Sequence, residues 1–186
     1  MLTTELGMPW ETSHVAQIDD VGVDVVVVER APPWLSMLAP LPPTGRVNAI
    51  VSPNTFERVT RDSLFTIGID PASPVGIALH RDVAAITASF LEQFAVTKAN
   101  YRLDVSAGTS CPKFHSDVVH VRLITTYVGP GTEFVHQDRA LSVVRIATGS
   151  LCFLKGRLHA TYGDSVLHRS PEVDDDGARL ILALDF

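Results

Sequence analysis

Residues 114–117 of this chain read Phe-His-Ser-Asp, and they place an imidazole and a carboxylate two positions apart. On a β-strand, residues i and i+2 project from the same face, so His115 and Asp117 could reach one ligand together. A second imidazole from a distant strand would complete a set of two histidines and one carboxylate. Such a set holds one face of an octahedral iron(II) and leaves the opposite face open for chemistry. His168, in His-Arg-Ser-Pro at 168–171, is the candidate for the second imidazole.

His-x-Asp occurs at two other places, so the spacing alone is weak evidence for a metal site. His80 and Asp82 lie at the predicted start of a helix, where residues two apart point about 200° away from each other around the axis. We therefore interpret Asp82 as an N-cap or first-turn acid. His136 and Asp138 follow a Gly-Pro-Gly turn in a polar stretch, and we interpret them as solvated loop residues.

The pair at 115 and 117 has a more favourable context, because it leads directly into a predicted long strand over 118–128. Every second residue from His115 to Tyr127 would then share one face of that strand. A polar pair at one end and a tyrosine further along suit the wall of a ligand pocket. A hydrogen bond between His115 and Asp117 that only fixes the strand end explains the same residues equally well.

Arg179 stands at the head of an apolar strand predicted over 180–184, directly after a tight turn at 174–177. On the outer face of a sheet this residue would be an ordinary solvated charge, which is the more common case. On the inner face it would require an anion, and a guanidinium suits bidentate binding of a carboxylate. The residue types leave both alternatives open.

Three further side chains near these positions could be functional, and each has a simpler explanation. Arg122 and Lys155 could bind an acidic substrate, but isolated basic residues are usually solvated, so we expect both at the surface. Cys111 precedes His115 by four residues. We expect a structural thiol there, because no oxyanion-hole element is recognisable near it.

The elements that would position these residues are mostly strands. A helix is predicted over 82–98, where apolar residues recur at spacings of three and four. After it the pattern changes to period two, and turns rich in Gly, Pro and Asp separate the segments. Short strands are predicted at 101–105, 118–128, 141–146, 151–154, 165–167 and 180–184. Strands at roughly ten-residue spacing after a helix are typical of a sandwich or jelly roll.

The first half of the chain is less regular. It reads as a strand over 21–29, a proline-rich loop over 31–43, a helix from Pro53 to about Leu64 and a second loop over 69–75. We predict a single domain, 1–186, that is mostly β with an N-terminal α/β elaboration. Residues 1–98 are expected to pack as helices and loops on a core formed by residues 99–186, which carries the metal site.

Composition excludes several classes of function. With 46% hydrophobic and 19% charged residues the chain is globular rather than disordered. Its net charge of −6 and the lack of a basic stripe argue against a nucleic-acid partner. The longest apolar run, 25–28, is too short to span a bilayer, and no signal-peptide pattern is present at the N-terminus. Two cysteines make no disulfide framework, so we expect a cytoplasmic protein.

The whole set of residues resembles that of the iron(II)/2-oxoglutarate-dependent dioxygenases, which carry His-x-Asp, a distal His and an Arg or Lys beyond it. Here His168 follows Asp117 by 51 residues and Arg179 follows His168 by 11, which is one more than is common in those enzymes. Over most of its length the chain is also similar to a bacterial family, domain of unknown function 1826. That similarity rests on the segments at 111–117, 126–133, 154–156 and 168–171.

The resemblance implies a double-stranded β-helix (a cupin-like jelly roll) with iron(II) bound by His115, Asp117 and His168. It also implies that Arg179 pairs with the distal carboxylate of 2-oxoglutarate, with Tyr127 as a second contact, and that a small molecule or a peptide is hydroxylated. A cupin-like protein with a structural or sensory zinc on the same ligands is the alternative. A metal-free interaction module would instead place His115 and His168 far apart.

Overall fold

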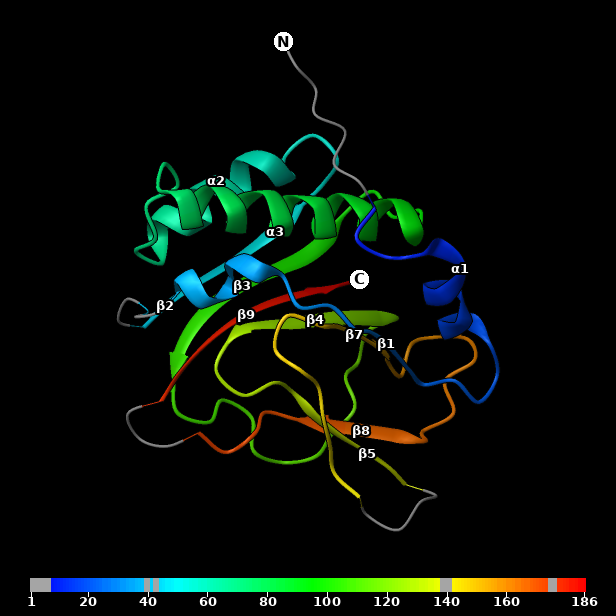
Figure 1. Cartoon of the computed structure of the whole chain (residues 1–186). Coiled ribbons are helices and arrows are strands. Elements are labelled where there is room, and N and C mark those ends of the chain that lie inside the picture. Colours follow the sequence, from blue (N-terminus) through cyan, green and yellow to red (C-terminus); the bar gives the residue numbers. More distant parts are fainter. Residues whose placement is uncertain (1–7, 39–40, 42–43, 138–141, 174–176) are drawn as a thin grey trace.

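The computed structural model describes residues 8–38, 41, 44–137, 142–173 and 177–186, and it contains two antiparallel sheets that face each other (Figure 1). Helices cover the outer side of the larger sheet. The strand order is β1-β7-β4-β9-β3-β2 in the larger sheet and β6-β5-β8 in the smaller one. No helix in these residues is long and apolar enough to cross a membrane.

The order of the elements makes the fold a jelly roll. The larger sheet consists of β1 (Val25–Val28), β2 (Gly45–Val51), β3 (Ala99–Ala107), β4 (Val121–Val128), β7 (Leu151–Lys155) and β9 (Ala178–Asp185). The smaller consists of β5 (Glu133–His136), β6 (Val144–Arg145) and β8 (Val166–Arg169). The helices are α1 (Thr12–Val15), η1 (Ala16–Asp19), η2 (Pro33–Leu38), α2 (Phe56–Thr66) and α3 (Pro74–Gln93). From β4 onward the chain passes repeatedly between the two sheets, so the predicted double-stranded β-helix is confirmed.

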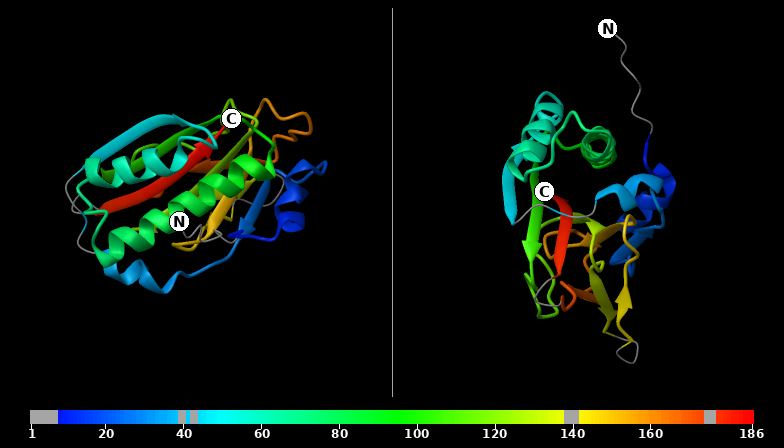
Figure 2. Two further views of the ribbon diagram at one scale, coloured as in Figure 1. Left: turned by 90° about the horizontal axis from the view of Figure 1, so that it is seen from above. Right: turned by 60° about the vertical axis from the view of Figure 1, so that its left-hand side comes forward.

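The larger sheet has one apolar face against the helices and one mixed face toward the smaller sheet. Alternate residues of its strands, such as Leu103, Leu123 and Leu182, join the main core with α3. The intervening residues, such as Ile124 and Ala183, belong to a second cluster that includes residues of β5 and β8. Figure 2 shows α3 running along the outer face of this sheet. Period two therefore separates the core from the side on which the site lies.

Helix α3 begins at Pro74, eight residues before its predicted start. Ser73 caps it, because the Ser73 hydroxyl accepts a hydrogen bond from the amide of Gly76 and Pro74 occupies the first turn. Asp82 lies in the middle of this helix, so its interpretation as a cap is wrong. Its carboxylate instead accepts hydrogen bonds from both terminal nitrogens of Arg30, at 2.6 and 2.8 Å, and from the hydroxyl of Tyr127 at 2.8 Å.

The N-terminal part of the chain contributes strands to the large sheet as well as helices. Strand β1 lies inside the predicted segment 21–29, whereas β2 was not predicted. Strand β2 pairs with β3 over its whole length, from Gly45 opposite Val105 to Val51 opposite Ala99. Residues 1–98 therefore contribute two strands, β1 and β2, to the larger sheet, in addition to the helices and loops that were expected to pack on residues 99–186.

Lys155 is buried rather than solvated, contrary to expectation, since its side chain is 0% exposed. Its ammonium donates to the carbonyls of Asp20 and Thr161 and to the Thr161 hydroxyl, and it lies 3.8 Å from the carboxylate of Asp24. Asp24 also accepts hydrogen bonds from the backbone of Gly163 and from both the amide and the hydroxyl of Ser165. This buried cluster fastens the start of β8 to the segment that precedes β1.

The pKa of Asp24 is set by two opposing effects. Burial disfavours the charged form, but the hydrogen bonds from Ser165 and Gly163 and the charge of Lys155 outweigh it, so the pKa of Asp24 is lowered. A carboxylate whose pKa is lower in the folded than in the unfolded state stabilises the fold above the unfolded value. That stabilisation is lost as the pH falls through the folded pKa.

Replacing Asp24 with Asn should lower the free energy of unfolding by about 2–4 kcal/mol at neutral pH, because it leaves the Lys155 ammonium buried without a counterion. Urea denaturation of the two proteins measures the difference. The difference should narrow as the pH falls from about 4, the unfolded value, through the lowered pKa of the folded wild-type carboxylate. The exposed Glu29→Gln change is the charge-matched control and should have little effect.

Candidate metal centre

The structure brings His115, Asp117 and His168 together, with one ligand atom of each within 4.8 Å of the others. His168 Nε2 lies 3.2 Å from Asp117 Oδ2, and His115 Nε2 lies 3.8 Å from Asp117 Oδ1. The two imidazole rings are 4.5 Å apart between centroids. This proximity removes the metal-free arrangement in which the two histidines lie far apart.

A backbone bridge between His115 and His168 brings the three ligands into register. The amide of His115 donates to the carbonyl of His168 at 3.0 Å, and the amide of His168 donates back at 2.9 Å. The sequence predicted that His115 leads directly into a long strand. In the structure His115 is not part of a strand that continues into β4. Residues 116–120 bend, and β4 begins only at Val121. The ligand pair therefore sits on a short segment held against β8, which carries the second histidine.

This bend changes which residues of β4 face the site. Arg122 and Ile124 lie on the side of the metal cluster, whereas Tyr127 belongs to the main core under the helices. The Tyr127 hydroxyl donates to Asp82, which is on α3. The expected contact between Tyr127 and the cosubstrate is therefore wrong. Side chains alternate between faces only within a continuous strand, so the bend between His115 and β4 prevents the face of Tyr127 from being counted from His115.

The surroundings of the three ligands leave the correct atoms free to bind a cation. His115 Nδ1 lies 2.8 Å from the carbonyl of Lys113, so this nitrogen is the donor and Nε2 is left as the acceptor. Asp117 Oδ1 is 2.6 Å from an Arg122 nitrogen. Asp117 Oδ2 is buried and has no hydrogen-bond partner among the described residues, although His168 Nε2 lies close to it. A buried carboxylate oxygen without a donor, beside two imidazole nitrogens, is what a bound cation would satisfy.

One spacing between these atoms matches that of two neighbouring ligands of a single ion. Neighbouring ligands of an octahedral ion are about 3 Å apart when each lies about 2.1 Å from the metal. The 3.2 Å between His168 Nε2 and Asp117 Oδ2 is close to that value. The donor set of two imidazoles and one carboxylate suits iron(II), and it also accepts zinc.

Arg122, which was expected at the surface, holds the carboxylate ligand in place. Its guanidinium bridges Asp117 and Asp185, with nitrogen–oxygen distances of 2.6 Å to each. Burial disfavours the charged form of Asp117, but the contact with His168 and the charge of Arg122 outweigh it, so the pKa of Asp117 is lowered. Asp117 is thereby kept as an anion with a fixed orientation. Only the pairing of β4 with β9, which no local pattern in the sequence shows, reveals this role.

The three ligands line a cavity of about 210 Å³, and Arg179 of β9 lines the same cavity. Its side chain is fully buried, donates from Nε to the carbonyl of Pro130 at 2.9 Å, and has no carboxylate partner among the described residues. Burial lowers the pKa of Arg179 to about 10. Of the two alternatives for this residue, the structure shows the inner-face position. A buried guanidinium without a counterion is a site for an anion.

Gly129 is needed for this placement of Arg179. Its φ is +82°, and a Cβ at this position would lie 2.7 Å from the carbonyl oxygen of Ala178 and 2.8 Å from Cγ of Arg179. Glycine adopts positive φ without strain and allows the close approach. Cys111 also lines the cavity, with its sulfur 3.9 Å from the His115 ring nitrogens. Asp138 and residues 174–176 of the turn predicted at 174–177 lie outside the described residues.

The chain belongs to a family described as "Protein of unknown function (DUF1826)", whose model matches residues 11–185. No curated protein matches the sequence significantly. The family assignment agrees with the resemblance found at 111–117 and 168–171, the segments that carry the three candidate ligands.

Solved structures with a similar fold include three that bear oxygenase or hydroxylase names. A prolyl-4-hydroxylase from Pseudomonas putida is 14% identical, with a TM-score of 0.55, over 100% of this chain and 96% of the other. The rice dioxygenase for auxin oxidation is 14% identical, with a TM-score of 0.53, over 97% and 80%. A putative oxygenase from Shewanella oneidensis is 12% identical, with a TM-score of 0.50, over 93% and 84%. At these identities the similarity establishes the fold alone.

Replacing Asp117 with Asn should weaken the binding of a divalent metal by at least about tenfold, because a neutral amide removes the only anionic ligand of the three. Isothermal titration with Mn(II) measures the affinity. His80→Ala is the matched control, since His80 belongs to another His-x-Asp segment but lies on α3 against the carbonyl of Glu57. Equal Mn(II) affinity in the wild type and Asp117→Asn would contradict the site.

Proposed function

We propose that this protein of the DUF1826 family is a mononuclear iron(II)-dependent oxygenase that uses 2-oxoglutarate and hydroxylates a small molecule or a peptide. The observation that carries the proposal is one cavity in which two imidazoles and a carboxylate converge beside a buried guanidinium that has no carboxylate partner in the part of the chain that the structure describes. The fold shared with solved oxygenases and hydroxylases supports it.

The ligand atoms in the proposed enzyme are His115 Nε2, Asp117 Oδ2 and His168 Nε2. When bound there, iron(II) would supply coordination of the 2-oxo acid and activation of O2 at positions that the protein leaves open. The protein's own contribution is orientation. Lys113 fixes the ring of His115 through its carbonyl, and Arg122 fixes the carboxylate of Asp117.

Arg179 is the proposed partner of the distal carboxylate of 2-oxoglutarate. Its Nε is held by the carbonyl of Pro130, and one terminal nitrogen lies 3.4 Å from the Thr126 hydroxyl, so the guanidinium is oriented before any ligand binds. Ile124 and Ile181 form apolar parts of the cavity wall. Apolar walls exclude water, which strengthens the attraction between the guanidinium and a carboxylate.

The purified protein loaded with Fe(II) should consume O2 and convert 2-oxoglutarate into succinate and CO2, even slowly and without a substrate, when ascorbate is added to reduce the second oxygen atom to water. An oxygen electrode and succinate quantification measure the two reactions. Asp117→Asn should abolish both, and His80→Ala should retain them. Stoichiometric zinc in the isolated protein, with no O2 uptake after exchange for Fe(II), would overturn the proposal in favour of a structural or sensory metal site.

Arg179→Gln should raise the dissociation constant of 2-oxoglutarate by at least about tenfold, because it removes a charge-assisted pair with the distal carboxylate. Titration of the Mn(II)-loaded protein measures this constant. Tyr127→Phe should leave it unchanged, because the hydroxyl lies on the other face of the sheet. Loss of 2-oxoglutarate affinity in Tyr127→Phe but not in Arg179→Gln would contradict the assignment, provided that both variants melt cooperatively.

A further inference from the structure

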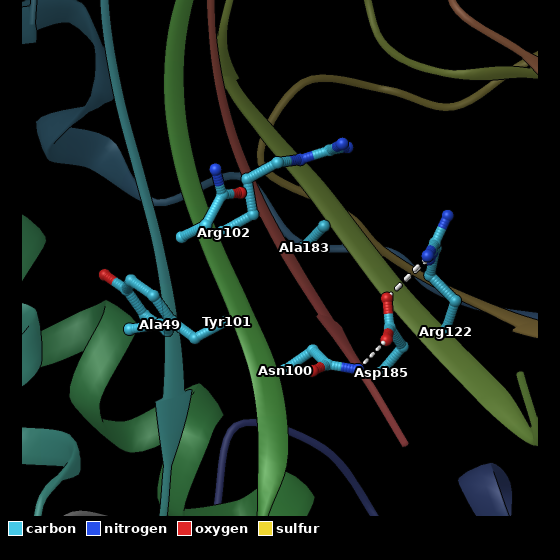
Figure 3. Close-up of a pocket in the computed structure, with 8 residues that line it drawn as sticks. Ala49, Asn100, Tyr101, Arg102, Arg122, Ala183 and Asp185 are labelled. Carbon is cyan, nitrogen blue, oxygen red and sulfur yellow. Dashed lines mark hydrogen bonds and ion pairs between the residues drawn. The ribbon is translucent and has the colours of Figure 1, made fainter.

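A groove of about 310 Å³ adjoins the metal cavity on the inner face of β3 and β2. It is lined by Asn48, Asn100, Arg102, Arg122 and Asp185, together with Ala49, Tyr101 and Ala183 (Figure 3). Arg102 and Arg122 line both the groove and the metal cavity. The groove and the metal cavity therefore share these two side chains as parts of their walls.

The groove exists because the smaller sheet covers only part of the larger one. The apolar cluster between the sheets includes residues of β1, β4, β7 and β9 but none of β2 or β3. On these two strands the same face carries the polar residues Asn48, Asn100 and Arg102, which alternate with buried apolar ones. Ile50, on this face of β2, is 65% exposed. This end of the inner face is thus an open, polar surface next to the reaction site.

Among the described residues, no ion pair balances the charge of Arg102 in the groove. Asp185 is taken by Arg122 at 2.6 Å and by the amide of Asn100 at 2.8 Å, and Asp104 pairs with Arg46 at 2.7 Å. Arg102 makes no ion pair within the described residues, and its Nε is buried without a hydrogen-bond partner. A guanidinium in that state is a ready partner for a bound anion.

The small residue opposite Arg102 on β9, Ala183, allows the Arg102 side chain to extend toward the metal cavity. Ala183 lies opposite Arg102 in the pairing of β3 with β9, and Ile124 of β4 lies opposite Ala183. The small side chain of Ala183 leaves space over β9. Figure 3 shows the Arg102 side chain extending across β9 in the direction of β4. The guanidinium therefore stands where the groove opens into the cavity of His115, Asp117 and His168.

Arg102 and Arg179 extend from different strands, β3 and β9, and both line the metal cavity. Arg102 is paired with Ala183, which is four residues, or about 13 Å, along β9 from Arg179. Only Arg102 also lines the groove, so a ligand in the groove would meet the Arg102 guanidinium, whereas an anion at Arg179 would lie within the cavity. With the anion at Arg179 assigned to 2-oxoglutarate, an anion at Arg102 belongs to the substrate.

We propose that the groove is the substrate subsite and that Arg102 binds a carboxylate of the substrate at the opening into the metal cavity. The proposal rests on the proposed function for the reaction, but the binding of a carboxylate does not require turnover. A singly charged carboxylate suits the position better than a phosphate. Asp185 and Asp117 flank the opening, so a second negative charge would be repelled. A neutral group would leave the guanidinium without a counterion.

Matched pairs of small molecules test the proposal. Benzoate with benzamide, and hexanoate with hexanamide, are titrated by NMR into the full-length protein loaded with Zn(II) and saturated with 2-oxoglutarate, so that no oxidation occurs. Each carboxylate should bind at least about tenfold more tightly than its amide and should shift the backbone signals of residues 48–50 and 100–102. Equal affinity within the pairs, or tighter binding of phenyl phosphate than of benzoate, would overturn the proposal.

Variants identify the residue responsible. Arg102→Gln should abolish the preference for the carboxylate, and Arg102→Lys should retain part of it, since the ammonium keeps the charge but not the planar fork. Arg61→Gln removes an exposed charge from α2, on the other side of the sheet, and should retain the full preference. If a folded Arg102→Gln protein still prefers carboxylates to amides, Arg102 is not the residue that binds the carboxylate.

The two proposals fail in different ways. Carboxylate binding that depends on Arg102, together with an Fe(II)-loaded protein that does not turn over 2-oxoglutarate, supports the subsite and overturns the oxygenase. Turnover of 2-oxoglutarate without any preference for carboxylates overturns the subsite alone. Arg102→Gln could lower the affinity for 2-oxoglutarate more than Arg179→Gln does. In that case Arg102 binds the cosubstrate, and the proposed substrate subsite is overturned.

Discussion

The two backbone hydrogen bonds between His115 and His168 are the constraint on which the arrangement of the site depends. They join a bent segment before β4 to strand β8 of the smaller sheet, across more than fifty residues of chain. Asp117, two residues after His115, is thereby brought to 3.2 Å from the second imidazole. The buried cluster of Asp24 and Lys155 secures the loop that leads into β8, so the position of His168 also depends on a charge pair far from the metal ligands.

In the part of the chain that the structure describes, some arginines around the cavity are paired with carboxylates and others are not. The paired one holds a metal ligand in place, and the unpaired ones are available to bind anionic ligands. Arg122 is neutralised by Asp117 and Asp185 and acts as a brace for the ligand carboxylate. Arg179 and Arg102 have no carboxylate partner among the described residues and face the same cavity. In a chain with a net charge of −6, two such guanidiniums at one cavity are a local reversal of charge that favours anionic ligands. Small residues make both positions possible, Gly129 beside Arg179 and Ala183 beside Arg102.

The residue pattern by itself predicted a sandwich or jelly roll and identified the three candidate ligands. Period-two segments separated by turns of Gly, Pro and Asp predicted the strands from residue 99 onward except β5, because alternation is a property of each strand by itself. Strand β5 includes His136, which was interpreted as a loop residue. The types of the candidate ligands and their order along the chain could also be predicted, because imidazole and carboxylate donors are identified from single residues. The inner-face role of Arg179 was one of two alternatives that residue types left open.

Only the tertiary structure decided which faces and which partners these residues have. Alternation relates residues within a continuous strand, so the bend at 116–120 reversed the expected face of Tyr127. Asp82 was misplaced because the cap that starts α3 lies at Ser73, before the periodic part of the helix. Arg122, Lys155 and Arg102 could not be assigned from the sequence, because a charged side chain is exposed, paired or free according to what distant strands place beside it. Local pattern determines the type of donor and the period of the strand, and long-range pairing determines what each donor meets.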